Sequence, residues 1–245
     1  MEKVAILVDG DFYLRRAIHF WEKRTAKDRA EELHRYCMKH LMHPHRQGKN
    51  REWVRDKLYR IFFYDCPPSQ KQIYNPLTGK TENLKNSAIY AFRTELHNEL
   101  MNKRKVALRF GELREQDIVY TFLPDVAKKL LKGDRKIESI TQDDIYISLA
   151  QKGVDMRVGL DIASLAYKKQ VTKIVLISGD SDFVPAAKLA RREGIDFVLD
   201  PMGQGISTSL NEHIDGITSC TQTDPLQTKQ THQSKRYTKK GKDNC

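Results

Sequence analysis

The chain has 245 residues, with 43 Lys or Arg against 32 Asp or Glu, which gives a formal net charge of +11. This length fits one sizeable α/β domain with insertions or two small domains, and the positive charge favours a polyanionic partner such as nucleic acid. No apolar run approaches the roughly 18 residues that a membrane-spanning helix needs, which excludes such a helix.

The first part of the chain is predicted to contain two strands separated by a charged insertion. The apolar run KVAILVDGD predicts a strand that ends in Asp9 and Asp11. Within residues 22–56, apolar residues recur at helical spacing among many charges, which predicts a surface helix followed by a basic loop. The run LYRIFFYDCPP at residues 58–68 predicts the next strand, which two prolines end.

The middle of the chain forms a second insertion, at residues 69–140. It begins with a turn-rich stretch, continues with a long basic helix at 84–104, and then has a strand in KVALRFGEL. Residues 113–140 show no clear pattern, and their structure is left open. From Gln142 onward the chain is expected to turn helical.

Two motifs dominate the last part of the chain. The segment KGVDMRVGLDIASLAYKKQ predicts a helix with Asp155 at its start. The segment VLISGDSDFVPAAKLARREG predicts a buried strand that runs into Asp180 and Asp182, and then a helix that tolerates Pro185 in its first turn. IDFVLDP predicts a last strand, and the polar, basic residues 221–245 are predicted to be a disordered tail.

This alternation of strands and helices predicts an α/β fold in which a mostly parallel sheet has helices on both faces. The carboxyl ends of parallel strands lie on one rim, which would bring Asp9 and Asp11 together with Asp180 and Asp182. A helix that leads into a parallel strand starts near the same rim, so we expect Asp155 there too. Each aspartate alone could simply cap a helix or a turn, but their convergence indicates a site.

Several carboxylates in one place need a counter-charge. Two such charges about 5 Å apart repel by about 3 kcal/mol at an effective dielectric constant near 20. A divalent cation offsets this repulsion, and oxygen donors with little His or Cys nearby favour Mg²⁺ or Mn²⁺ over zinc. Because such a cation can activate water and neutralise a phosphodiester, hydrolysis of a nucleic-acid backbone fits the pattern.

Basic and aromatic residues near the first two acids suggest how a nucleic acid would be held. Phe12, Arg15 and Arg16 follow these acids; they either bind a base and phosphates or belong to the core and to a solvated helix face. Arg93 and the basic run at 103–105 add a further basic surface, which either contacts phosphates or is only solvated.

Three segments carry a resemblance to a known family: VAILVDGDF, KGVDMRVGLDIASLAY and VLISGDSDFVPAAKLARREG. They resemble the NYN domains, the LabA-like branch of the PIN-like nuclease superfamily, and LYRIFFYDCPP looks like that family's second strand. The resemblance implies a PIN-like three-layer sandwich over residues 1–220, in which residues 22–56 and 69–140 are insertions. It also implies a metal-dependent ribonuclease.

By this resemblance, the family's acidic site falls on four aspartates that would bind metal and carry catalysis. These are Asp9, Asp155, Asp180 and Asp182. Asp161 is expected as a further metal ligand. Ser178 and Ser181 also match and are expected to hydrogen-bond the acids or a phosphate. Asp11 stands where many members have Asn or Glu, and it is expected to contact the substrate.

The expected function is that of a cytoplasmic, Mg²⁺- or Mn²⁺-dependent endoribonuclease that cuts single-stranded RNA by attack of an activated water. One alternative is a non-cleaving RNA-binding or regulatory module that retains the acids. Another is a haloacid-dehalogenase-type phosphatase, suggested by DGDFY, although Tyr13 stands where that motif has a small residue. DNA as a substrate and a homodimer stay open. The cytoplasmic location follows from four scattered cysteines and from a first segment that reads as a strand rather than a signal peptide.

Overall fold

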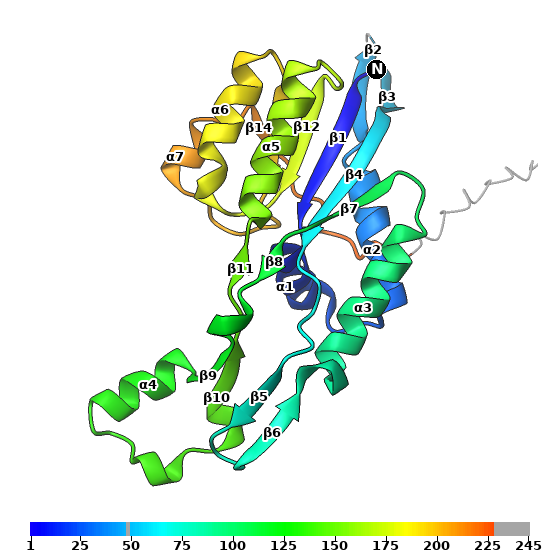
Figure 1. The fold of residues 1–245 in the computed structure, drawn as a ribbon. Helices are drawn as coiled ribbons and strands as arrows, with labels where there is room; N and C mark the ends of the chain where they lie inside the picture. Colours follow the sequence, from blue (N-terminus) through cyan, green and yellow to red (C-terminus); the bar gives the residue numbers. More distant parts are fainter. Residues whose placement is uncertain (48–49, 228–245) are drawn as a thin grey trace, which may run out of the picture.

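A computed structural model describes residues 1–47 and 50–227 of the chain. Its centre is a six-stranded sheet in the order β14-β13-β12-β1-β4-β7, and every neighbouring pair of strands is parallel (Figure 1). The strands are β1 (Lys3–Asp9), β4 (Lys57–Asp65), β7 (Val106–Phe110), β12 (Lys173–Ile177), β13 (Asp196–Asp200) and β14 (Gly216–Ile217). The predicted parallel sheet is therefore confirmed.

Helices cover both faces of this sheet. One face carries α1 (Gly10–Trp21), α2 (Ala26–Lys39) and α3 (Ala88–Met101), and the other carries α5 (Val154–Tyr167), α6 (Val184–Arg192) and α7 (Thr208–Asn211). Because side chains alternate along a strand, Ile6 packs in the first core and its neighbour Leu7 in the second. The fold is thus the expected three-layer sandwich, with one hydrophobic core on each side of the sheet.

The order of the strands changes direction between β1 and β12. From β1 the chain proceeds to β4 and β7 on one side, whereas β12, β13 and β14 extend the sheet on the other side. The helices change face at the same point, since α1 to α3 precede β12 on one face and α5 to α7 lie on the other. In open parallel sheets, ligands bind at the carboxyl ends of the strands at such a switch point. The end of β1 and the loop after β12 therefore lie where a site is expected.

The first insertion differs from its prediction in two ways. The helix at 22–56 is α2, but it packs in the core, where Leu33 and Tyr36 are fully buried. The many charged residues of this segment favour a surface helix. Two of them, however, form an ion pair inside the core, Arg29 with Glu32 at 2.7 Å. The expected basic loop is instead a hairpin of β2 (Met42–Gln47) and β3 (Asn50–Arg55), which carries Pro44 in a two-stranded sheet.

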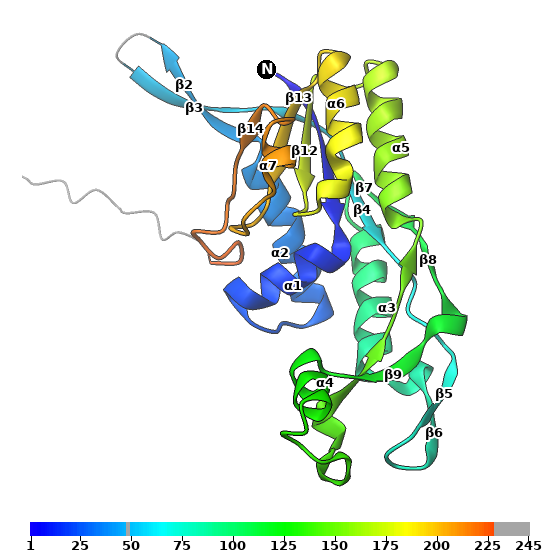
Figure 2. The same cartoon turned by 90° about the vertical axis from the view of Figure 1, so that its left-hand side faces the viewer.

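The stretch predicted as a second insertion, residues 69–140, divides between two places: α3 and β7 (Val106–Phe110) belong to the sandwich, and the rest lies in a lobe that we define as residues 69–84 and 114–150 (Figure 2). The lobe contains β5 (Gln72–Asn75) paired with β6 (Lys80–Asn83), β9 (Val119–Phe122) paired with β10 (Ile145–Ser148), and α4 (Pro124–Leu131). A small core of Ile73, Leu84 and Ile118 holds its two segments together. The short pair β8 (Glu112–Leu113) and β11 (Gln151–Lys152) connects the lobe to the sheet.

The expectation that the chain turns helical from Gln142 is wrong. Only a single 3-10 turn forms there, η4 (Gln142–Asp144), and the β-formers that follow it make β10. The other 3-10 turns are η1 (Leu84–Asn86), η2 (Glu115–Asp117), η3 (Ile137–Ser139) and η5 (Ser181–Phe183).

The tail predicted at 221–245 falls mainly outside the described residues. Its first part packs back on the body, where the carbonyl of Thr223 accepts a hydrogen bond from Lys39 at 2.7 Å and Asp224 pairs with Arg24. Of the four cysteines, the three in the described part of the chain are unpaired. Within that part, no helix has the length and apolar character to cross a membrane.

Candidate active site

Asp9 is the last residue of β1 and the N-cap of α1. Its Oδ1 accepts a hydrogen bond from the backbone N–H of Phe12 at 3.1 Å, which fixes the carboxylate at the rim of the sheet. Burial raises the pKa of Asp9 to about 6, and the negative charges of Asp11 and Asp155 add to this increase. A positive charge beside Asp9 would therefore stabilise its ionised form.

The loop after β12 lies beside Asp9 because β12 pairs with β1 in parallel. Ser178 is buried in this loop, where its Oγ donates to Asp9 Oδ2 at 3.3 Å and accepts from the backbone N–H of Asp180 at 3.3 Å. Asp180 in turn caps η5 by accepting a hydrogen bond from the N–H of Asp182 at 3.0 Å. One serine thus joins the two loops that carry the acids.

Asp155 approaches the same rim from α5. It lies in the first turn of the helix, just after Gly153, whose φ of 77° is the left-handed conformation that glycine adopts readily. Burial raises the pKa of Asp155, and the charges of Asp180 and Asp182 raise it further. Ser178 and the N–H of Asp182 connect Asp9, Asp180 and Asp182 by hydrogen bonds, and Asp155 interacts electrostatically with all three; we call these four residues the acidic cluster.

The donor set of this cluster fits a hard divalent cation. In the part of the chain that the structure describes, none of the four carboxylates forms an ion pair with Lys, Arg or His. They are spread around the rim, and no three His, Cys, Asp or Glu side chains of the described residues are placed to hold one ion. Mg²⁺ requires no such cage, because it usually keeps several waters and binds through one or two carboxylates and substrate phosphates.

Asp11 has a different environment from the other acids. It pairs with Arg15 at 2.6 Å and with Arg93 of α3 at 2.8 Å. Arg93 also pairs with Asp65, the last residue of β4, at 2.5 Å, and His97 donates to the same carboxylate at 2.8 Å. Burial raises the pKa of Asp65, but these partners outweigh burial and hold it below its ordinary value. Asp11 is therefore already neutralised by arginine.

Sequence reasoning missed Asp65 and the role of Arg93. Asp65 ends an apolar strand just as Asp9 does, so the signal was present in YDCPP. The sequence predicts Arg93 only as part of a basic surface, yet its side chain is 19% exposed and forms ion pairs with two aspartates. Nothing in its spacing predicts that contact.

The structure places Asp161 apart from the cluster. It lies six residues after Asp155, which is about 9 Å further along α5. Its Oδ2 accepts hydrogen bonds from the Tyr64 hydroxyl at 2.8 Å and from Arg109 Nε at 2.9 Å. These contacts connect α5 to β4 and β7, so Asp161 supports the helix that carries Asp155.

The expected substrate-binding residues divide into buried and exposed ones. Phe12 is 6% exposed and packs under Gly179, where a Cβ would lie 2.9 Å from its ring. Arg16 donates Nε and Nη2 to the carbonyl of Met202 at 3.1 and 2.8 Å. Phe12 thus belongs to the core, and Arg16 holds the backbone at Met202 in place. Arg15 and Ser181, by contrast, are exposed at the site.

Comparison with known proteins identifies the family. The NYN domain model matches residues 81–218, which is more than half of the chain. The chain belongs to the NYN domain family. NYN domains are part of the PIN-like superfamily and are generally nuclease-like. The matched stretch includes Asp155, Asp180 and Asp182, while Asp9 precedes it.

Two individual proteins are also similar to this NYN domain. The uncharacterized protein MJ0482 of Methanocaldococcus jannaschii is 24% identical over 125 residues, which cover 51% of this chain and 49% of that protein. The chain thus spans about half the length of this curated relative. A crystal structure of VPA0982, a protein of unknown function from Vibrio parahaemolyticus, has a TM-score of 0.43 at 14% identity and covers 89% of this chain and 93% of that one.

Proposed function

We propose that this NYN domain is an endoribonuclease that depends on Mg²⁺ or Mn²⁺. The observation that carries the proposal is the cluster of Asp9, Asp155, Asp180 and Asp182 at the switch point, without a cation partner among the described residues. One or two of these four carboxylates would hold the ion, together with water and a substrate phosphate, and the others would add negative charge around it. When bound, it would place positive charge against a phosphodiester and lower the pKa of a water.

The chain's own residues hold this arrangement in place. Ser178 connects Asp9 to the backbone of Asp180, and the N–H of Phe12 orients the Asp9 carboxylate. Arg15, whose side chain is 71% exposed, is available to contact a phosphate. In the hydrolysis, the water oxygen bonds to phosphorus, the bond from phosphorus to the leaving ribose oxygen breaks, and a proton passes to that oxygen.

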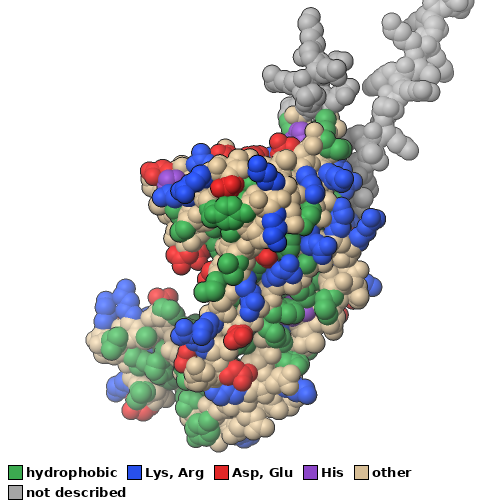
Figure 3. Space-filling model, turned by 45° about the horizontal axis from the view of Figure 1, so that its top comes forward, with side chains coloured by type: hydrophobic (Ala, Val, Ile, Leu, Met, Phe, Trp, Pro, Cys, Tyr) green, Lys and Arg blue, Asp and Glu red, His purple; other side chains and the backbone are tan. Residues whose placement is uncertain are grey.

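The surface around the site suits a strand of RNA. Figure 3 shows a hollow between the lobe and the body, with acidic side chains at its edge and Lys and Arg side chains over the neighbouring surface. The net charge of +11 gives an additional, sequence-independent attraction for the RNA backbone. This pattern supports RNA as the substrate.

The test is cleavage of a 5′-labelled single-stranded RNA by the purified chain, with Mn²⁺, with Mg²⁺ and with EDTA. We expect cleavage with either metal, none in EDTA, and a decrease of about 100-fold or more in Asp180→Asn. The matched control is Asp196→Asn. Asp196 is the first residue of β13, so it lies at the amino ends of the strands, away from the acidic rim, and it pairs there with Lys173 at 2.8 Å. Circular dichroism of both variants checks folding.

A non-cleaving RNA-binding module is the second candidate. It is favoured by the spread of the carboxylates, no three of which are placed in the described structure to hold one ion. Binding of the RNA in Mn²⁺ without any cleavage, equal in wild type and Asp180→Asn, would support this module and contradict the endoribonuclease.

A further inference from the structure

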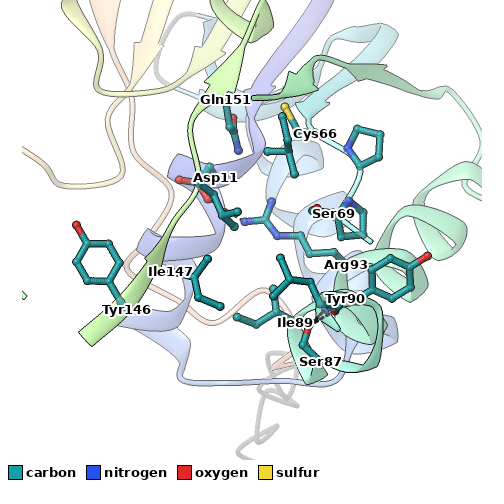
Figure 4. A pocket seen from close by; sticks show the side chains of 15 residues that line it. Asp11, Cys66, Ser69, Ser87, Ile89, Tyr90, Arg93, Tyr146, Ile147 and Gln151 are labelled. Atoms are coloured by element: carbon teal, nitrogen blue, oxygen red, sulfur yellow. Dashed lines mark hydrogen bonds and ion pairs between the residues drawn. The ribbon is translucent and has the colours of Figure 1, made fainter. Parts of the chain in front are cut away.

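A pocket of about 350 Å³ has Asp11, a near neighbour of Asp9, in its lining. One wall is the loop after β4, with Cys66; a second is the start of α3, with Tyr90 and Arg93; and a third is β10 and β11 of the lobe side, with Ile147 and Gln151. Figure 4 shows Arg93 extending across this space toward Asp11, with Gln151 and Cys66 at the same end. The pocket is therefore built jointly by the body and the lobe.

Two of its walls also carry the catalytic acids. Asp11 lines the pocket and lies two residues after Asp9, in the first turn of α1. Gln151 lines it from the other side and lies four residues before Asp155. A phosphate placed between Asp9 and Asp155 would thus have the pocket within reach of the nucleotide that bears it.

The lining combines apolar walls with a few polar side chains, among which Gln151 is the one carboxamide. The hydroxyls of Ser69 and Ser87 already donate to Glu115 and to the carbonyl of Leu84, at 2.9 and 2.7 Å. The carboxamide of Gln151, by contrast, has no hydrogen-bond partner within residues 1–47 and 50–227. A carboxamide offers both a donor and an acceptor, which is what recognition of a base edge requires.

Arg93 adds a flat, charged surface to this pocket. Asp65 and Asp11 hold its guanidinium from two sides, at 2.5 and 2.8 Å, so it is fixed in position before any ligand arrives. Guanidinium planes stack on nucleobases. The volume also lies within the range of about 300–1,000 Å³ that is usual for small-ligand sites.

We infer that this pocket holds one unpaired nucleobase of the RNA whose phosphate lies at the aspartates, with Gln151 on its edge and Arg93 at its face. The inference rests on the proposed function. A base can enter only when it has left a helical stack, so the pocket selects single-stranded RNA over duplex RNA. It also makes cleavage depend on which base stands at one position beside the cut.

The test measures binding of a fluorescein-labelled 12-nucleotide RNA in EDTA, so that it does not depend on cleavage. A series of the same RNA with a single abasic site at successive positions locates the base that matters. We expect one position, and no other, to lose about tenfold in affinity, and the duplex form to bind more weakly than the single strand. A series that binds equally at all positions overturns the inference.

The variant Gln151→Ala is expected to weaken binding about fivefold to tenfold and to remove the dependence on the base at that position. Gln72→Ala is the matched control, because Gln72 is also exposed but lies on β5, outside this pocket. Equal affinities of the two variants contradict the inference. Cleavage assays in Mn²⁺ separate the two proposals: uncut RNA with a clear abasic effect refutes only the nuclease, and cut RNA with a flat series refutes only the base pocket.

Discussion

The pH dependence of folding stability should be controlled by one buried pair on the side of the sheet that carries α2. His40 donates from Nε2 to Asp200 at 2.8 Å, and both side chains are almost fully buried. Burial lowers the pKa of His40, but hydrogen bonds with Asp200 and Cys220 outweigh it and raise the pKa to about 9. In the unfolded chain this pKa is about 6.5.

Because the folded state binds the proton more tightly, His40 stabilises the fold fully below pH 6.5, and this contribution is lost as the pH rises through 9. At about 1.4 kcal/mol per pKa unit, the pair contributes about 3 kcal/mol to the free energy of unfolding below about pH 6.5. Of this, about 2 kcal/mol should be lost between pH 6.5 and 8.5. His40→Gln should remove this slope, since glutamine does not titrate.

The assay is urea unfolding of the wild type and of His40→Gln at pH 6.5, 7.5 and 8.5. Trp21 is a suitable fluorescent reporter, since it is 8% exposed and its ring lies 5.5 Å from that of Tyr36, whose hydroxyl donates to Asp200. Other titrating groups affect both proteins equally, so the difference between their free energies of unfolding isolates His40. If the two proteins lose stability in parallel over this range, the reasoning is refuted.

Three further predictions concern the site. Saturating Mn²⁺, about 100 times its dissociation constant, should stabilise the wild type by about 2.7 kcal/mol in calorimetry and leave Asp180→Asn unchanged; an equal shift in both would place the ion elsewhere. Gly10→Ala should destabilise the fold by about 1–3 kcal/mol in urea, because its Cβ would lie 2.6 Å from the carbonyl oxygen of Tyr64; an unchanged midpoint would contradict this close contact. Arg93→Gln should cost about 3–5 kcal/mol, because it leaves the buried Asp65 without its arginine, and a loss under 1 kcal/mol would show that His97 suffices.

The sequence predicts the sheet and its acidic rim because both depend on local patterns. Continuous apolar runs mark strands that are buried on both faces, and β1, β4 and β12 are such strands. An aspartate that follows such a run must lie at the strand's carboxyl end, and in a parallel sheet these ends share a rim. Asp9 and Asp180 were therefore within reach of sequence reasoning.

The remaining features depend on contacts between distant residues, which a pattern does not contain. Arg93 reaches Asp11 across 82 residues, and His40 reaches Asp200 across 160. The charges of α2 suggest exposure, although Arg29 and Glu32 neutralise each other inside the core. The lobe was unreadable for the same reason, since its apolar residues are few and find their partners only when two separate segments meet.

The construction of the lobe from two segments limits how it could be gained, lost or transplanted. Residues 69–84 belong to the crossover from β4 to β7, and residues 114–150 belong to the crossover from β7 to β12. Ile73 and Leu84 lie on the first segment and Ile118 lies on the second. Removing either segment alone would therefore expose the apolar side chains of the remaining segment to water. A shortened chain therefore requires both excisions at once, and a chimera that takes the lobe from a relative must exchange both crossovers together.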